Sequence, residues 1–315
     1  MPETPTSKGG AVTADPALPA SHTRPLDPLA AALVTVLCLS WGLNQVAIKL
    51  AIHEIPPLLQ ALVRSLGAGA IVFAWMRWRN LPVLARDGSL PAGLFCGLLF
   101  ALEFVCIYHA LNYTTATRAI LFLYLAPFFV VVGIRWLMPA DRFGARQWVG
   151  LILSFIGMML AFGLPTPALD PRQIFGDVLS VASAFFWALT TLLIKTSRLS
   201  RVSAEKSMLY QLAVSVPILA FSSWLLGEQM VTSMPSTIAL GAVAYQTLYI
   251  VPVTYVAWFA LIVRYSASRL SAFSFLTPLF GIAAGHLVLG DPLTPAFAVA
   301  VALVMAGLVL VNRPG

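Results

Sequence analysis

Long apolar stretches alternate with short polar breaks along most of the chain. From Leu29 onward each stretch is close to the roughly 20 residues that a helix rising 1.5 Å per residue needs to cross a bilayer. The expected spans are residues 30–51, 57–76, 91–111, 115–138, 146–163, 174–195, 205–226, 236–262, 268–289 and 293–311. This pattern predicts an all-α integral membrane protein with ten transmembrane helices.

The residues before the first span have a different character. Residues 1–28 hold several prolines among small and polar residues and have no continuous apolar segment that could act as a secretory signal. We therefore expect a disordered cytoplasmic tail over residues 1–28.

The composition agrees with a lipid environment. Hydrophobic residues make up 59% of the 315 residues and charged residues only 10%, against roughly 25% charged in an ordinary soluble domain. The few polar residues could not cover the surface of a soluble globule, so the composition excludes a water-soluble domain. The lipid bilayer is the expected surrounding.

The basic residues indicate how the chain is oriented. Placing the tail in the cytoplasm puts most of the 19 Lys and Arg residues in cytoplasmic breaks and leaves Lys49, Arg118 and Arg172 outside. Arg64 falls inside the second span. We predict a multi-pass protein of the cytoplasmic (inner) membrane with both termini cytoplasmic. The net charge of +7 then reflects topology, and no nucleic-acid partner is expected.

Comparison of the chain with itself reveals a long repeat. The segment from Trp41 to Lys49 aligns with the segment from Trp187 to Lys195. Residues 116–118 and Pro127 likewise align with residues 267–269 and Pro278, and a short gap brings Gly157 onto Gly307. The first helix therefore corresponds to the sixth and the fourth to the ninth.

An odd number of helices per unit inverts the second copy relative to the first. The repeat predicts one five-helix unit over residues 29–163 and a second over residues 164–315, related by a two-fold axis in the membrane plane. Inverted repeats of this kind are typical of secondary transporters with a site at the midplane. A pore or an anchor does not need that symmetry.

These motifs resemble those of EamA-type members of the drug/metabolite transporter superfamily over roughly residues 30–312. The resemblance rests on Trp41-Gly42 with Lys49, on Trp187 with Lys195, and on the lead-ins Thr115-Ala116-Thr117-Arg118 and Ser266-Ala267-Ser268-Arg269 before Pro127 and Pro278. It implies export or exchange of small metabolites, often amino acids or related compounds, by alternating access. The chain departs from the family at residues 138–141, where Met-Pro-Ala-Asp replaces the more usual Gly-Glu.

Glu103 is the acidic residue that lies in the middle of an apolar span. A charge there costs several kcal/mol unless it faces a wet cavity or a partner. The carboxyl group could bind a proton or a substrate ammonium and release it as access alternates, which makes Glu103 the expected coupling residue. A protonated Glu103 that only supports helix packing is the alternative.

Other polar and aromatic residues are expected to line the substrate site. Trp41, Asn44 and Gln45 share one side of the first helix at helical spacing, and Trp187 and Thr191 repeat that geometry in the sixth. Gln246 and Tyr249 lie in the eighth span, where Pro252 can kink the helix. Amides that join helices, and tyrosines that merely pack, are the alternatives.

Basic residues and prolines at or inside the spans also have expected roles. Arg118 and Arg269 start helices, where their long side chains can reach lipid headgroups. The paired prolines of the fourth and ninth helices favour kinks, more for structure than for gating. Arg64 has no partner that the sequence identifies.

Enzyme and cofactor signatures are missing from the sequence. It contains no HExxH, GxSxG or GxxxxGK[ST] motif, and its four histidines and three cysteines show no metal-ligand spacing. We expect no enzyme activity, no cofactor and no metal, and any energy source would be a gradient. The prediction is a secondary active transporter that exports small metabolites, with protons as the expected coupling ion. A membrane scaffold or sensor without transport is the alternative, and an integral-membrane enzyme the least favoured one.

The oligomeric state stays open between a monomer and a homodimer. Gly93, Gly97 and Ala101 form a stripe of small residues on the third helix. Such stripes serve internal helix contacts as readily as dimers.

Overall fold

The computed structural model describes residues 26–83, 85–139, 143–162, 170–228, 231, 233–290 and 292–313. The predicted tail, apart from its last residues, lies outside this range, as does the first part of the second predicted unit. The described elements are helices: α1 (Pro28–Ala51), α2 (Pro57–Trp78), α3 (Leu90–Ala110), α4 (Ala116–Leu123), α5 (Ala126–Leu137), α6 (Ala145–Phe162), α7 (Pro171–Thr196), η2 (Arg198–Arg201), α8 (Ala204–Leu225), α9 (Thr237–Tyr245), η3 (Gln246–Tyr255), α10 (Val256–Arg264), α11 (Ala267–Phe273), α12 (Leu276–Leu289) and α13 (Ala296–Asn312).

These helices make the ten predicted membrane crossings within the described residues. Nine crossings are apolar helical stretches of at least 18 residues, and Ala296–Asn312 is a shorter apolar helix that spans the bundle beside α6. Three crossings consist of more than one helix: α4 with α5, α9 with η3 and α10, and α11 with α12. The all-α, ten-helix prediction is confirmed.

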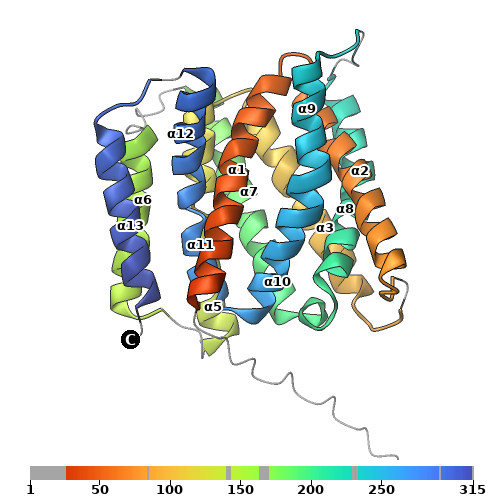
Figure 1. Cartoon of the computed structure of the whole chain (residues 1–315), viewed down its shortest axis with the longest axis horizontal. Helices are drawn as coiled ribbons and strands as arrows, with labels where there is room; N and C mark the ends of the chain where they lie inside the picture. The colour runs from red at the N-terminus through yellow and green to blue at the C-terminus, as the bar shows by residue number, and fades with distance from the viewer. Residues whose placement is uncertain are drawn as a thin grey trace, which may run out of the picture.

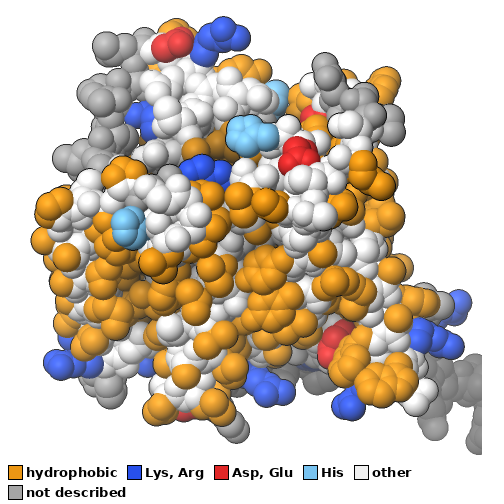
Figure 2. Space-filling view, turned by 45° about the horizontal axis from the view of Figure 1, so that its top comes forward, with side chains coloured by type: hydrophobic (Ala, Val, Ile, Leu, Met, Phe, Trp, Pro, Cys, Tyr) orange, Lys and Arg blue, Asp and Glu red, His pale blue; other side chains and the backbone are white. Residues whose placement is uncertain are grey.

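The start of α1 and the end of α13 lie at the same face of the bundle, at the bottom of Figure 1. We call this the terminal face and the other end the opposite face. In Figure 2 hydrophobic side chains cover the sides of the bundle, and Lys and Arg side chains gather along the lower edge. Trp78 and Trp136 are exposed near the terminal face and Trp224 near the opposite face, as expected for residues at the two membrane–water interfaces.

The helix contacts of the two halves match in the way that an inverted repeat requires. α1 packs against α12, and the corresponding helix α7 packs against α4 and α5. α3 packs against α7, and α1 packs against α9 and η3 in the corresponding way. Helices that correspond to each other pair directly, α2 with α8 and α6 with α13. This is the arrangement that a two-fold axis in the membrane plane generates.

The repeated lead-in motif is a helix N-cap in both halves. The Thr115 side chain accepts a hydrogen bond from the backbone N–H of Arg118 at 3.3 Å, and the Ser266 side chain accepts one from Arg269 at 3.4 Å. Hydroxyl side chains at this position satisfy backbone donors that the first helical turn leaves free. The motif therefore marks the start of α4 and of α11.

The prolines of the fourth and ninth crossings coincide with breaks in the helices. α4 ends at Leu123 and α5 begins at Ala126, and α11 ends at Phe273 and α12 begins at Leu276, so Pro127 and Pro278 lie just after matched breaks. Proline has no N–H and cannot complete the helical ladder. In α11 the carbonyl of Phe273 accepts a hydrogen bond from the Cys38 thiol at 3.3 Å.

Arg118 does not reach toward headgroups, and that expectation was wrong. The side chain is 9% exposed and forms an ion pair with Asp177 of α7 through two hydrogen bonds, from Nε to Oδ1 at 3.1 Å and from Nη2 to Oδ2. The Thr114 hydroxyl donates to the same Oδ1 at 2.7 Å. The acid that neutralises Arg118 is supplied by another helix near the opposite face, so the guanidinium is held inside the bundle.

We expect Asp177→Asn to destabilise the protein strongly. Breaking a buried ion pair leaves one charge uncompensated and costs about 3–5 kcal/mol. The midpoint of thermal unfolding in detergent should fall for D177N and recover in part in the double variant R118L/D177L, which removes both charges. Asp170→Asn is the matched control, because Asp170 caps the same helix from its exposed end and asparagine caps equally well. Equal melting of D177N and D170N would refute a stabilising pair.

Candidate functional site

A half-buried acid and a buried base lie near each other inside the bundle. Glu103 of α3 is half-buried, and Arg64 of α2 is 1% exposed. Each lies about 10 Å from the opposite-face end of its helix, at a rise of 1.5 Å per residue. The two side chains interact electrostatically. A cation across the helix interface thus offsets part of the cost of an acid in the membrane interior, although the two groups form no ion pair within 4.0 Å among the described residues.

The helix that carries Glu103 is held by close packing on two sides. Gly93 and Gly97 bring α3 against Tyr210 and Val214 of α8, where a larger side chain would collide. On the other side the Ser183 hydroxyl of α7 donates to the backbone carbonyl of Glu103 at 2.9 Å. The stripe of small residues therefore serves a contact inside this chain.

Aromatic side chains surround the charged pair. The Arg64 guanidinium lies 4.2 Å from the centroid of the Phe104 ring, a cation–π contact. Tyr108 and Tyr255 both lie within electrostatic reach of Arg64 and of Glu103. The Tyr255 ring packs edge-on against Trp41 at 5.9 Å and against Phe100 at 6.3 Å. Trp41, predicted to line the site, therefore lies in the same cluster as Glu103.

The predicted face of the first helix divides between two surroundings. The Trp41 indole N–H donates to the Thr254 hydroxyl at 2.9 Å, and Asn44 is buried with an Oδ1 that has no hydrogen-bond partner among the described residues. Gln45, in contrast, is exposed and lies beside Gly281 of α12. Trp41 and Asn44 face the interior, while Gln45 lies toward the α12 side.

The corresponding residues of the sixth helix lie in a separate aromatic group. Trp187 packs edge-on against Tyr124 at 5.9 Å, and Tyr124 stacks at a tilt on Phe275 at 6.2 Å. Tyr124 and Phe275 are the residues at the two helix breaks. Thr191 is buried one turn further along α7. Trp187 therefore contacts the fourth and ninth crossings at their breaks, whereas Trp41 contacts η3 and α10 of the eighth crossing.

Gln246 and Tyr249 lie in η3, the π-helical segment that contains Pro252, and both contact other helices. The Gln246 amide donates to the Gln60 side-chain carbonyl of α2 at 3.2 Å. The hydroxyl oxygens of Tyr249 and of Ser40 in α1 are 3.0 Å apart. Gln246 is fully buried and its Oε1 lacks a partner among the described residues. These contacts fix η3 against α1 and α2, the helices that carry Trp41 and Arg64.

Sequence reasoning did not place Arg64, Tyr108 and Tyr255 in the site. An arginine inside an apolar span was the available signal, because such residues mark functional positions by default. Its neighbours come from α3 and from the junction of η3 and α10, far away in the sequence. No spacing rule connects them.

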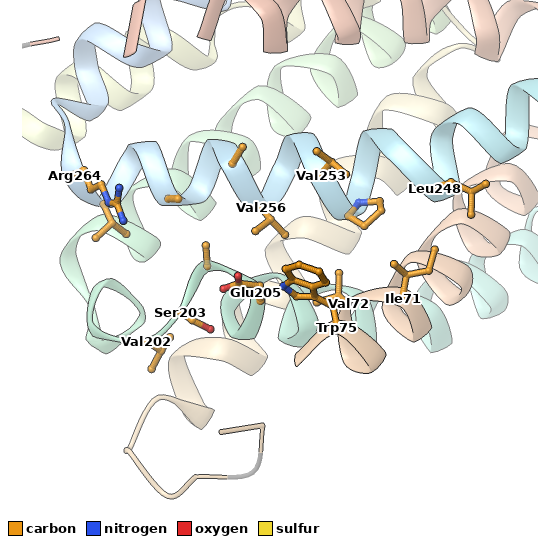
Figure 3. A pocket seen from close by; sticks show the side chains of 15 residues that line it. Ile71, Val72, Trp75, Val202, Ser203, Glu205, Leu248, Val253, Val256 and Arg264 are labelled. Atoms are coloured by element: carbon orange, nitrogen blue, oxygen red, sulfur yellow. The ribbon is translucent and has the colours of Figure 1, made fainter. Parts of the chain in front are cut away.

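A large groove lies elsewhere, on the side of the bundle between α2, α8 and the junction of η3 with α10 (Figure 3). Its volume is about 640 Å³, and its walls are mostly apolar, with Trp75 opposite Val256. Glu205 and Arg264 lie toward its terminal-face end. None of the predicted site residues lines this groove. The internal cluster around Glu103 therefore remains the candidate site.

The EamA-like transporter family matches residues 28–163 and 174–313, one copy in each half of the bundle. The chain belongs to the EamA-like transporter family. A probable amino-acid metabolite efflux pump of Salmonella typhimurium is 31% identical over 294 residues, covering 90% of this chain and 93% of the relative. An uncharacterized transporter of Archaeoglobus fulgidus is 28% identical over 262 residues, covering 79% and 85%.

The fold also has a counterpart among solved structures. One crystal structure superposes with a TM-score of 0.75 over 90% of this chain and 96% of that chain, at 19% sequence identity. At this identity the likeness shows the fold alone. The EamA-like family, the names of the relatives and the many apolar helices together indicate a multi-pass membrane transporter and point away from an enzyme.

Proposed function

We propose that this EamA-like protein exports small metabolites of the amino-acid type by alternating access, with Glu103 in its substrate site. The observation that carries the proposal is the Glu103–Arg64 pair inside the membrane region, surrounded by Trp41, Phe104 and Tyr255. Desolvated charges of opposite sign beside aromatic rings suit a small amphipathic molecule better than bulk lipid.

The inverted repeat supports alternating access. Residues 29–163 and 164–315 act as the two related units, and exchanging their roles turns an opening at one face into an opening at the other. The paired breaks at Pro127 and Pro278 provide matched points where the fourth and ninth crossings can bend. The terminal face, rich in Lys and Arg, is the cytoplasmic one in this proposal.

Glu103 links the chemistry to an energy source. Its carboxyl group takes up a proton or a substrate ammonium when the site opens to one face and releases it at the other. Since the sequence has no ATP-binding motif, a proton gradient or the gradient of the substrate itself drives the cycle. Trp41 and Asn44 form a wall of the site on α1, and Gln246 and Tyr249 hold η3 in register with it. Trp187 and Thr191 form the matched wall on α7, against the fourth and ninth crossings.

Metabolite release from whole cells tests this proposal directly. Cells that overproduce the protein are compared with cells that carry an empty vector, and small molecules in the medium are measured over time by mass spectrometry. The expected result is enrichment of one or a few small amino compounds outside, with a matching fall inside. If the media stay identical over a broad panel, the exporter proposal is wrong.

A further inference from the structure

One edge of the buried Arg64 side chain is free to bind a ligand. Nε and Nη2 of Arg64 have no hydrogen-bond partner among the described residues, although the side chain is 1% exposed. The Phe104 ring lies 4.2 Å from the guanidinium carbon and covers one planar face, and the Tyr255 hydroxyl lies within hydrogen-bonding reach of the guanidinium, but neither accepts from Nε or Nη2. Buried charged donors without acceptors cost more free energy than neutral ones, so an anion is the expected partner for this edge.

The same protein shows which anion fits such an edge. Nε and Nη2 of Arg118 donate to the two oxygens of the Asp177 carboxylate. This side-on, two-point contact is the geometry in which a guanidinium recognises a carboxylate. Other buried cations have acceptors: Lys195 donates to the carbonyls of Val263 and Tyr265, and Lys206 donates to Asp87. Arg64 is therefore set apart by its two free donors.

Glu103 balances part of the positive charge of Arg64 but leaves the Nε and Nη2 donors of the guanidinium unused. Glu103 interacts with Arg64 electrostatically but does not accept from Nε or Nη2. The other titratable groups close to Glu103 are Tyr108, Tyr255 and the thiols of Cys96 and Cys106, which supply no second positive charge. The cluster thus presents one cation and one anion side by side between aromatic rings.

From this geometry we infer that Arg64 binds the carboxylate of the transported substrate while Glu103 faces its ammonium group. The substrate class is a zwitterion, an α-amino acid or a close derivative with both groups free. A zwitterion leaves the net charge of the site unchanged, whereas a simple amine or a simple carboxylate would add an unpaired charge in the membrane interior. This inference rests on the proposed function, because it takes the Glu103 cluster as the transport site.

Binding to the purified full-length protein in detergent tests the inference without requiring transport. The probes are the standard amino acids, their carboxamides and the amines that lack the carboxyl group, each titrated for its shift of the thermal unfolding midpoint. We expect at least one amino acid to bind, and its carboxamide to bind at least about tenfold more weakly, since a hydrogen-bonded charge contact is worth about 1.5–3 kcal/mol. The carboxamide keeps the shape but loses the negative charge and replaces one acceptor oxygen with an NH2 donor, so it cannot make the two-point contact.

The variant Arg64→Lys tests whether Arg64 is the residue that distinguishes the amino acid from its carboxamide. Lysine keeps the positive charge that offsets Glu103 but has no planar two-donor edge. R64K should bind the amino acid about tenfold more weakly and lose most of its preference over the carboxamide. Arg118→Lys is the matched control and should keep that preference, because Arg118 pairs with Asp177 away from the site. The unfolding midpoint of each variant without ligand reports whether it is folded.

Three results would overturn the inference: equal binding of acid and carboxamide, an unchanged preference in R64K, or no binding by any amino acid of the panel. The outcome is independent of the export experiment. Selective binding with no release from cells would leave the inference standing and refute the exporter. Release of amines that lack a carboxyl group would support an exporter and refute the role of Arg64.

Discussion

Glu103→Gln is expected to lower the rate of export at least about tenfold while the protein still folds and reaches the membrane. The substitution keeps the size of the side chain and one acceptor oxygen but removes its negative charge, which is worth about 1.5–3 kcal/mol in a contact with an ammonium group. It also leaves the charge of Arg64 without a neighbouring anion. Initial rates of release of the identified compound, at equal membrane abundance, measure the effect.

The control for this prediction is Glu205→Gln, the same chemical change at the first turn of α8 near the terminal face. Losing an acid there costs a few tenths of a kcal/mol through the helix dipole and leaves the site untouched. Export by E205Q should therefore equal that of the native protein. If E103Q also exports at the native rate, Glu103 is a packing residue and its proposed coupling role is wrong.

Substrate exchange separates the two roles that Glu103 could have. If Glu103 carries the proton, E103Q should still exchange external for internal substrate across vesicles but should no longer respond to a pH gradient. If Glu103 holds the substrate ammonium, E103Q should lose exchange and net export together. A variant that keeps both exchange and its response to the pH gradient would place the proton site elsewhere.

The features that the sequence predicted well are those with a local or repeated signal. Ten apolar stretches mark ten crossings, because lipid requires a continuous apolar helix for each one. The breaks in the fourth and ninth crossings follow from Pro127 and Pro278, whose missing N–H acts on the adjacent turn. The starts of the fourth and ninth crossings were also predicted, at Arg118 and Arg269; the structure adds that the hydroxyl three residues before each of them caps the helix.

The features that sequence could not predict depend on which helices become neighbours. Arg118 was expected at the headgroups because Asp177, its partner, lies on α7 and no spacing connects the two. Arg64 lacked a partner in the sequence for the same reason, since Glu103 comes from α3. Gln45 was placed on the same face as Trp41, yet the neighbouring α12 takes up the side where Gln45 lies. Helical periodicity defines a face but does not say which helix covers it.

The contact between the fifth and tenth crossings depends on residues without side chains. A Cβ atom at Gly307 of α13 would lie 2.2 Å from the Ser154 hydroxyl oxygen, 2.4 Å from the Gly150 carbonyl oxygen and 2.8 Å from the Ser154 nitrogen. Two of these three atoms belong to the backbone of α6, so they cannot rotate away. Helices in lipid associate through such close packing, because lipid tails are as apolar as the helices and supply no hydrophobic driving force for association.

We therefore expect Gly307→Leu to force α13 away from α6 and to lower stability by at least about 3 kcal/mol, the upper end of the usual overpacking cost. The neighbouring substitution Ala306→Leu is the control, because Ala306 is exposed on the lipid side and an added apolar side chain is well tolerated there. Thermal unfolding in detergent should show an early transition for G307L and a native one for A306L. Similar melting of the two would mean that the backbones of α6 and α13 can separate at little cost. Because this pair lies at one end of the bundle, away from α2 and α3 (Figure 1), G307L molecules that stay folded should keep the native preference for substrate.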